Sequence, residues 1–330
     1  MNKSLSGLCC MLLVACAFAA HAAENYYVPL IRGQADDTCD LYWMKLNQDG
    51  KLVRAIRLIR DSAGKIESAA IVPQGNKMLY TERQLGNDFS QIYSLGLNPK
   101  NGKVTSGPVA LTSGSTYWHY GVSTSQDGRK FVYQRYPVSP WGDAEMLLRK
   151  FKKNGVLAPR AVPIPSASES GWPPVITEDG KYVYYGVRGG DDNIYVQALN
   201  ANGTPTGAPQ IALSGPPCGY PWLARIDAGR AWMSYVCFGP PNPDTVYLTR
   251  LSPSGQATGT PVKLVDPAPG TFVYGGITRN PRILIYTLDQ TTTWTVYSQK
   301  LDANGNPVGA PIVLSPATDR TQAAWIVPIG

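Results

Sequence analysis

The side chains of this 330-residue sequence that could do chemistry are aromatic rings, acids and one histidine, and they form no recognisable catalytic motif. No Gly-x-Ser-x-Gly segment occurs, and a Ser-His-Asp triad would have to use His119, the one histidine outside the N-terminal segment. The adjacent acids Asp36-Asp37 and Asp191-Asp192 are typical of turns and, less often, of calcium ligands. The sequence therefore indicates binding rather than hydrolysis, and it predicts no metal site and no cofactor.

The aromatic residues gather at the starts of predicted strands that recur about every fifty residues. Such rings either wedge between packed units or form a platform for sugar rings or for the apolar side chains of a peptide. Nearby acids would then orient the polar groups of the ligand. The candidate partner-binding residues are Trp118, His119, Tyr120, Trp172, Trp222, Tyr274, Trp325 and Trp141, together with the acids Asp88, Asp143 and Asp192.

The N-terminal segment has the features of a secretory signal peptide over residues 1–22: Lys3, an apolar run over 5–18 and an Ala-His-Ala cleavage site at 20–22. Residues 13–16 also resemble the bacterial lipobox, in which Cys16 would be lipidated. No other stretch reaches the roughly 18 to 20 apolar residues of a membrane span. We therefore expect a periplasmic or secreted protein of a Gram-negative bacterium, with a lipoprotein as the alternative.

Three cysteines follow the signal segment, in a compartment that permits disulfides. Cys218 and Cys237 flank one predicted hairpin, and we expect them to form a disulfide. Cys39 would remain as a buried free thiol. The sequence contains no Cys-x-x-Cys pair, which argues against a catalytic or metal-binding role for Cys39.

Composition and repetition together predict the fold. Hydrophobic residues make up 43% and charged residues 16%, which excludes intrinsic disorder, and 33 Gly and 28 Pro beside 19 Tyr favour many short strands. Turn glycines recur with steps of 52, 53, 48, 52 and 50 residues, each between two predicted strands. Asp-Gly turns at 127–128 and 179–180 mark a preceding hairpin. The repeating glycines are Gly50, Gly102, Gly155, Gly203, Gly255 and Gly305.

Four antiparallel strands per repeat predict a β-propeller with six blades. The first unit starts at Tyr26 with what resembles a second strand, and residues 322–328 resemble the first strand of the next unit at 68–73. We expect this C-terminal strand to complete the N-terminal blade and close the ring. The expected single domain covers 23–330, with blades at 24–66 plus 320–330, 67–115, 116–168, 169–217, 218–268 and 269–319.

Residues 174–196 carry a family resemblance. They contain Thr-Glu-Asp-Gly-Lys, an aromatic strand, a polar turn and Ile-Tyr-Val, and they resemble the WD40-like propeller repeat of TolB-type proteins. The resemblance implies a six-bladed propeller that binds envelope proteins around one end of its axis. TolB-type proteins also have an N-terminal α/β domain, which we do not expect before Tyr26.

The net charge of the chain is +7, but the charged residues are expected to divide unevenly between the two ends of such a propeller. The connections from second to third and from fourth to first strands form the acidic face, and the other turns form the basic face, with few acids. The acidic face collects Asp36, Asp37, Asp40, Asp61, Glu67, Asp88, Asp143, Glu145, Glu169, Asp191, Asp192, Asp244, Asp266, Asp289 and Asp319. The basic face collects Lys51, Lys77, Lys100, Lys103, Arg129, Lys130, Lys152, Lys153, Lys181, Arg230, Arg279 and Arg282.

The first functional hypothesis is an exported, non-catalytic propeller that binds an envelope or secreted protein or peptide at its acidic, aromatic face. The alternatives are a carbohydrate-active or lactone-cleaving propeller enzyme that uses carboxylates, and a glycan-binding, lectin-like module. The basic face either keeps the protein soluble or meets anionic lipopolysaccharide phosphates. Nucleic acid is not an expected partner, because export removes it and the basic residues sit singly on turns.

Overall fold

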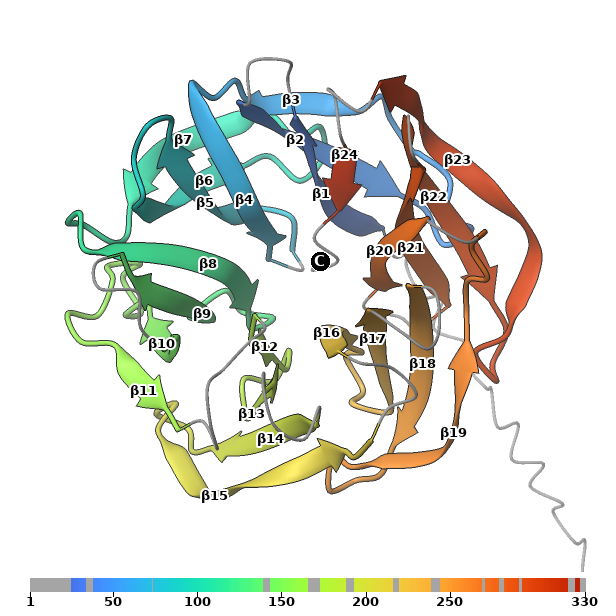
Figure 1. The fold of residues 1–330 in the computed structure, drawn as a ribbon. Coiled ribbons are helices and arrows are strands. Elements are labelled where there is room, and N and C mark those ends of the chain that lie inside the picture. Colours follow the sequence, from blue (N-terminus) through green and yellow to red (C-terminus); the bar gives the residue numbers. More distant parts are fainter. Residues whose placement is uncertain are drawn as a thin grey trace, which may run out of the picture.

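The computed structural model contains six four-stranded antiparallel sheets, or blades, arranged in a ring around a central axis (Figure 1). The described residues include no helix. The arrangement confirms the predicted all-β, six-bladed propeller. The structure describes residues 25–33, 38–72, 74–138, 143–165, 173–187, 193–215, 220–238, 244–268, 271–278, 282–290, 293–319 and 324–326.

Each blade runs from an innermost strand near the axis to an outermost strand at the rim (Figure 1). In that order, blade 1 contains β24 (Ala324–Ile326), β1 (Tyr26–Gly33), β2 (Cys39–Leu46) and β3 (Arg57–Arg60), and blade 2 contains β4 (Gly64–Ile71), β5 (Lys77–Gln84), β6 (Ser90–Leu97) and β7 (Val104–Ala110). Blade 3 contains β8 (Tyr117–Thr124), β9 (Lys130–Pro137), β10 (Glu145–Lys150) and β11 (Val162–Ile164), and blade 4 contains β12 (Val175–Ile176), β13 (Tyr182–Gly186), β14 (Ile194–Leu199) and β15 (Pro205–Leu213). Blade 5 contains β16 (Tyr220–Ile226), β17 (Trp232–Phe238), β18 (Thr245–Leu251) and β19 (Ala257–Lys263), and blade 6 contains β20 (Phe272–Ile277), β21 (Ile283–Gln290), β22 (Thr293–Leu301) and β23 (Pro307–Asp319).

The ring closes through the two ends of the folded chain. β24 is the innermost strand of blade 1 and pairs antiparallel with β1, with Leu30 opposite Ile326 and Arg32 opposite Ala324. Figure 1 shows red β24 beside blue β1, next to blade 6. The C-terminal strand therefore completes the N-terminal blade, as the sequence predicts.

The hydrophobic core lies in the six seams between neighbouring blades rather than at one centre. One cluster of buried side chains occupies each seam, so that Trp43 of blade 1, for example, shares a cluster with Ile66 and Tyr80 of blade 2. Because central strands contact a neighbouring blade on each face, they are apolar on both faces rather than alternating. Each blade depends on its neighbours for burial of its apolar surface.

The repeating turn glycines also hold neighbouring blades close together. Gly102 has φ of 69°, in the left-handed region that favours glycine, and a Cβ atom there would lie 2.6 Å from the Trp43 ring of the preceding blade. At the closing seam, the Ser298 hydroxyl of blade 6 donates a hydrogen bond of 2.7 Å to the Gly50 carbonyl of blade 1. At five of the six repeating glycines, all but Gly155, turn geometry thus combines with the close approach of the preceding blade.

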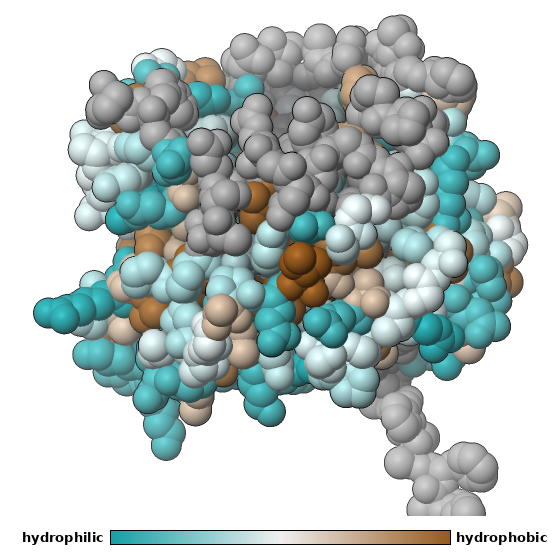
Figure 2. Space-filling view, turned by 60° about the horizontal axis from the view of Figure 1, so that its bottom comes forward, coloured by the Kyte–Doolittle hydropathy of each residue, from teal (hydrophilic) through white to brown (hydrophobic). Residues whose placement is uncertain are grey.

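The outermost strands form the rim of the ring. Figure 2 brings the side of β15 and β19 forward and shows a described surface that is mostly hydrophilic, with apolar residues in small groups. Gln197 and Gln299 fill register shifts in blades 4 and 6, where their amide groups donate to the carbonyls of Thr206 and Val308 at 3.0 and 2.8 Å. Such irregular edge strands are poor templates for pairing with another chain.

Cys39 is a free thiol, buried in β2. Cys237 is buried in β17 with Pro221 as its cross-strand partner, whereas Cys218 and Cys16 lie outside the described residues. The Cys218–Cys237 disulfide and the lipidation of Cys16 therefore stay predictions. Burial raises the pKa of the Cys39 thiol to about 11.

Thiol counting tests these cysteine assignments. In mature, oxidised protein that has been unfolded, we expect one thiol to react with Ellman's reagent, and three thiols after reduction. In the folded protein at pH 8 we expect Cys39 to react slowly, because a pKa of about 11 leaves about one thiol in a thousand ionised. Three reactive thiols in unreduced, unfolded protein would exclude the disulfide.

Candidate functional site

A cavity of about 370 Å³ lies on the axis, near the end at which the innermost strands begin. Four of these strands line it: β4, β8, β16 and β20, joined by the start of β22. This end of the ring is the acidic face. The residues that line the cavity are Glu67, Trp118, Tyr120, Trp222, Tyr274 and Trp294. Five aromatic rings and one carboxylate from four blades therefore converge on one site.

Blade 3 contributes two rings from one side of β8. Trp118 and Tyr120 are two residues apart and so share a face of the strand, and their ring centroids are 5.6 Å apart. The Tyr136 ring lies 5.4 Å from that of Trp118. Burial, followed by the charge of Glu67, raises the pKa of Tyr120 above its usual value, and Tyr274 of blade 6 adds to the rise. The opposite walls of the cavity are therefore close enough to interact.

Glu67 is the carboxylate of the cavity, and its side chain is 10% exposed. It accepts a hydrogen bond from the Trp118 indole N–H, and the Nε of Arg83 lies 3.2 Å from its Oε1. Burial raises the pKa of this carboxyl, and the contacts with Trp118 and Arg83 oppose the rise. The register between β4 and β5 shifts at Glu67, between Ile66 and Ser68, a bulge of the kind that re-aims side chains beside functional sites.

Blades 5 and 6 form an aromatic wall opposite blade 3. The Tyr274 ring is stacked on that of Trp294, with centroids 5.9 Å apart and planes within 14°. Trp222 meets Tyr274 edge-on at 6.4 Å, and Phe238 packs behind both. These offset and edge-on arrangements are the favourable geometries for aromatic pairs. The rings therefore hold one another in position by direct packing, without a ligand.

Two further acids stand behind this wall. Burial, then the charges of Asp289 and Asp244, raise the pKa of Tyr274 above its usual value. Both acids are themselves buried. Asp289 of blade 6 and Asp244 of blade 5 therefore lie near the ring of Tyr274 without lining the cavity themselves.

The structure places the predicted site residues as follows. Four of them, Trp118, Tyr120, Trp222 and Tyr274, line the cavity together. Asp88 and Asp143 are exposed and do not line it. Trp141, Trp172 and Asp192 lie outside the described residues, as does the side chain of Trp325, whose backbone belongs to β24.

His119 is separated from the cavity by the alternation of β8. Its neighbours Trp118 and Tyr120 face the cavity, whereas its own ring is buried, with Nδ1 2.6 Å from the Ser90 carbonyl oxygen. Burial lowers the pKa of His119 below its usual value. These contacts give His119 a structural role between blades 2 and 3.

Two cavity residues are absent from the set of predicted binding residues. Glu67 is counted there only as one acid among many on its face, and Trp294 belongs to a third strand rather than a first. The sequence does place Trp294 with the aromatic residues of the acidic face, at a connection from a second to a third strand. The bulge that places Glu67 leaves no signal in the sequence.

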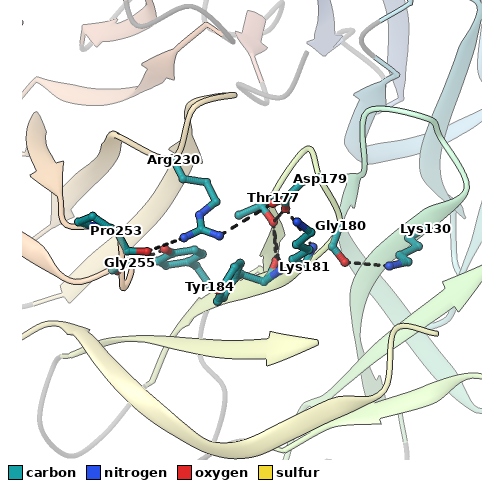
Figure 3. Close-up of polar contacts among 10 residues, drawn as sticks. Lys130, Thr177, Asp179, Gly180, Lys181, Tyr184, Arg230, Pro253 and Gly255 are labelled. Atoms are coloured by element: carbon teal, nitrogen blue, oxygen red, sulfur yellow. Dashed lines mark hydrogen bonds and ion pairs between the residues drawn. The ribbon is translucent and has the colours of Figure 1, made fainter. Parts of the chain in front are cut away.

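Several residues of the basic face join blades to one another (Figure 3). The Lys130 ammonium of blade 3 donates to the Gly180 carbonyl of blade 4 at 2.9 Å, and Arg230 of blade 5 donates to Pro253 at 2.8 Å and lies 3.9 Å from Asp179 of blade 4. This face also contains more acids than the sequence suggests, since Asp127, Asp179, Asp227 and Asp302 accept backbone N–H groups in its turns. Its excess positive charge is therefore smaller than a count of lysines and arginines implies.

Among the described residues, no group of three or more histidine, cysteine and acidic side chains could hold a metal ion. The described part of the chain also has no helix with the length and apolar character required to cross a membrane.

Comparison with known proteins places the fold. No family model matches the sequence, and no curated protein matches it. TolB from Acinetobacter baumannii is similar in structure, with a TM-score of 0.64 at 14% identity over 91% of this chain and 66% of that one. The periplasmic gluconolactonase of Pseudomonas aeruginosa gives 0.53 at 16% identity, covering 88% and 82%, and a candidate 6-phosphogluconolactonase from Bacteroides uniformis gives 0.53 at 13%, covering 92% and 99%. The chain therefore has a TolB-like β-propeller fold.

Proposed function

We propose that this chain is an exported, non-catalytic propeller that binds an envelope protein or peptide at the cavity formed by its six lining residues. The observation that carries the proposal is the convergence of five aromatic rings from blades 3, 5 and 6 on the axis. Large rings at the centre of a surface provide most of the binding energy in protein interfaces. The similarity to TolB and to a periplasmic gluconolactonase supports a periplasmic location.

An affinity pull-down from envelope extract tests this function. With mature protein as bait and mass spectrometry as readout, we expect one or two envelope proteins to be retained, and to be lost from the double variant Trp118→Leu/Trp222→Leu. The loss should exceed tenfold, because truncating a central ring costs about 2 kcal/mol or more. The matched control is Tyr182→Ala, whose ring lies beneath Arg230 at the other end of the propeller. Retention unchanged in the double variant, or equally reduced in the control, would contradict the proposal.

A lactone-cleaving enzyme is the second candidate, favoured by one observation. Glu67 places a carboxylate inside the cavity, where it could act as a general base, and a gluconolactonase is among the similar structures. Glucono-δ-lactone hydrolysis should be measured with the mature protein and with Glu67→Gln. Turnover that disappears in the variant would replace the binding proposal, whereas we expect both proteins to match the spontaneous rate.

A glycan would use the same rings as a stacking platform. Saturable quenching of tryptophan fluorescence by one oligosaccharide, among cell-wall and capsular sugars, would favour the lectin-like alternative. Lipopolysaccharide at the basic face stays a separate hypothesis. The exposed lysines that remain for it include Lys100, Lys103, Lys152, Lys153 and Lys181.

A further inference from the structure

Among the described residues, the six that line the cavity include no lysine or arginine. Three tryptophans and two tyrosines present π-systems whose faces are electrostatically negative. Tryptophan is the strongest side chain for cation–π attraction, and aromatic cages are the recurrent solution for binding ammonium groups. The composition of the cavity therefore favours a positively charged group over a neutral or anionic one.

The carboxylates near the rings also favour a positively charged ligand. Glu67 lies in the wall and is nearly enclosed, while the buried Asp244 and Asp289 lie close enough to Tyr274 for their charges to affect its ionisation. Arg83 is the cation paired with Glu67, but its side chain is 32% exposed, so that water screens its charge more than that of the enclosed carboxylate. Among the described residues, the Glu67 carboxylate is thus the charged group that lines the cavity beside the rings.

The rings are arranged to enclose a compact group. Tyr274 and Trp294 present a stacked pair, Trp222 stands edge-on to them, and Trp118 and Tyr120 form the opposing wall. A volume of about 370 Å³ is at the small end of the range for ligand sites, about 300 to 1,000 Å³. It suits one small molecule or the end of one side chain better than an extended chain.

We infer that this cavity binds an organic cation, an ammonium or trimethylammonium group held against the rings with Glu67 as its counter-charge. The inference rests on the proposed function and specifies its chemistry, since the cation is either a free small molecule or the side chain of a lysine in the partner. Anionic ligands such as phosphosugars are disfavoured by the same charges. No covalent step is involved.

A pair of isosteric probes isolates the charge. Choline and 3,3-dimethylbutan-1-ol have the same shape, but only choline carries a positive charge. Nα-acetyl-lysine amide, whose ε-ammonium group is free, represents a lysine side chain. Binding is followed by calorimetry and by tryptophan fluorescence at constant ionic strength. We expect choline or the lysine amide to bind at least tenfold more tightly than the neutral alcohol, as a desolvated cation–π contact implies. The tighter of the two cations identifies the source.

Two substitutions distinguish the contribution of the aromatic rings to cation binding from that of the Glu67 carboxylate. Glu67→Gln keeps the shape and should weaken cation binding about three- to tenfold while leaving the neutral alcohol unchanged. Trp222→Leu should weaken cation binding about tenfold, and Tyr182→Ala should not change it. Melting temperatures within a few degrees of wild type show that the variants are folded. If Glu67→Gln is not folded, the effect of Trp222→Leu on cation binding decides whether the cavity is the site.

Three outcomes would overturn the inference. Equal affinity for choline and the neutral alcohol would remove the cation preference while leaving the cavity as a binding site. Absence of binding by all three probes, with partner retention still dependent on Trp118 and Trp222, would remove the cation but keep the proposed function. Equal loss of cation binding in Tyr182→Ala would show that the cavity is not the site.

Discussion

Replacing Arg225 by methionine is expected to lower the free energy of unfolding by about 3–5 kcal/mol, the usual cost of removing one partner of a buried ion pair. Arg225 lies in β16 of blade 5, and its Nη2 is 3.1 Å from Oε1 of Glu178, which precedes the Asp-Gly turn of blade 4. Both side chains are 6% exposed, so water can replace neither. Urea unfolding followed by tryptophan fluorescence measures the change.

A second, exposed ion pair across another seam provides the control. Lys300 of blade 6 lies 2.9 Å from Asp49 of blade 1, with the two side chains 50% and 58% exposed. Lys300→Met should therefore cost no more than about 1 kcal/mol. The double variant Arg225→Met/Glu178→Leu should regain most of the stability that the single change loses, because no unpaired charge stays buried. Equal effects of Arg225→Met and Lys300→Met would contradict this account of the seam.

The repeat could be predicted because each blade encodes its turns locally. Gly102 and Gly255 adopt positive φ in the turns that the glycine spacing marks, and the alternating stretches 41–46 and 92–97, which precede two of these turns, lie within β2 and β6. The strand missing from the first unit also has a readable signature, because 322–328 resembles 68–73. Local turn chemistry and period were therefore sufficient for the topology.

The site could be predicted only in part, because its geometry depends on strand alternation and bulges. Trp118, Trp222 and Tyr274 lie at equivalent starts of innermost strands, which the repeat reveals. The sequence groups His119 with them, although a shift of one residue turns a side chain to the opposite face. Glu67 reaches the cavity at a bulge, and a single sequence does not show where one of two neighbouring strands gains a residue.

The charge of the basic face shows a related limit. The sequence assigns Lys130 and Arg230 to the basic face, and each donates to a carbonyl of a turn that is 50 or 23 residues away in the chain. Tyr184 likewise donates to the Gly255 carbonyl of the next blade at 3.2 Å (Figure 3). The Lys130 and Tyr184 contacts join neighbouring blades, and they follow from ring geometry and not from residue type.

Deleting residues 320–330 is expected to lower the melting temperature by about 10 °C or more, since each kcal/mol lost lowers it by about 2–4 °C in domains of 150–250 residues. The deletion removes β24 and leaves β1 as an unpaired innermost edge in blade 1. It also opens the seam with blade 6, where β24 contacts β21 and β22. Differential scanning calorimetry of the mature protein, with and without the segment, measures the shift.

A circular permutant distinguishes loss of the strand from loss of sequence. Because β24 and β1 are antiparallel, residues 320–330 can be moved ahead of residue 25 through a short loop, forming the same first hairpin that the other blades have. The permutant should recover most of the lost melting temperature, because the innermost strand of blade 1 returns although the chain now ends at blade 6. An unchanged transition on deletion would show that blade 1 does not need its innermost strand. A deletion effect that the permutant fails to reverse would show that covalent continuity from β23, rather than pairing with β1, carries the stabilisation.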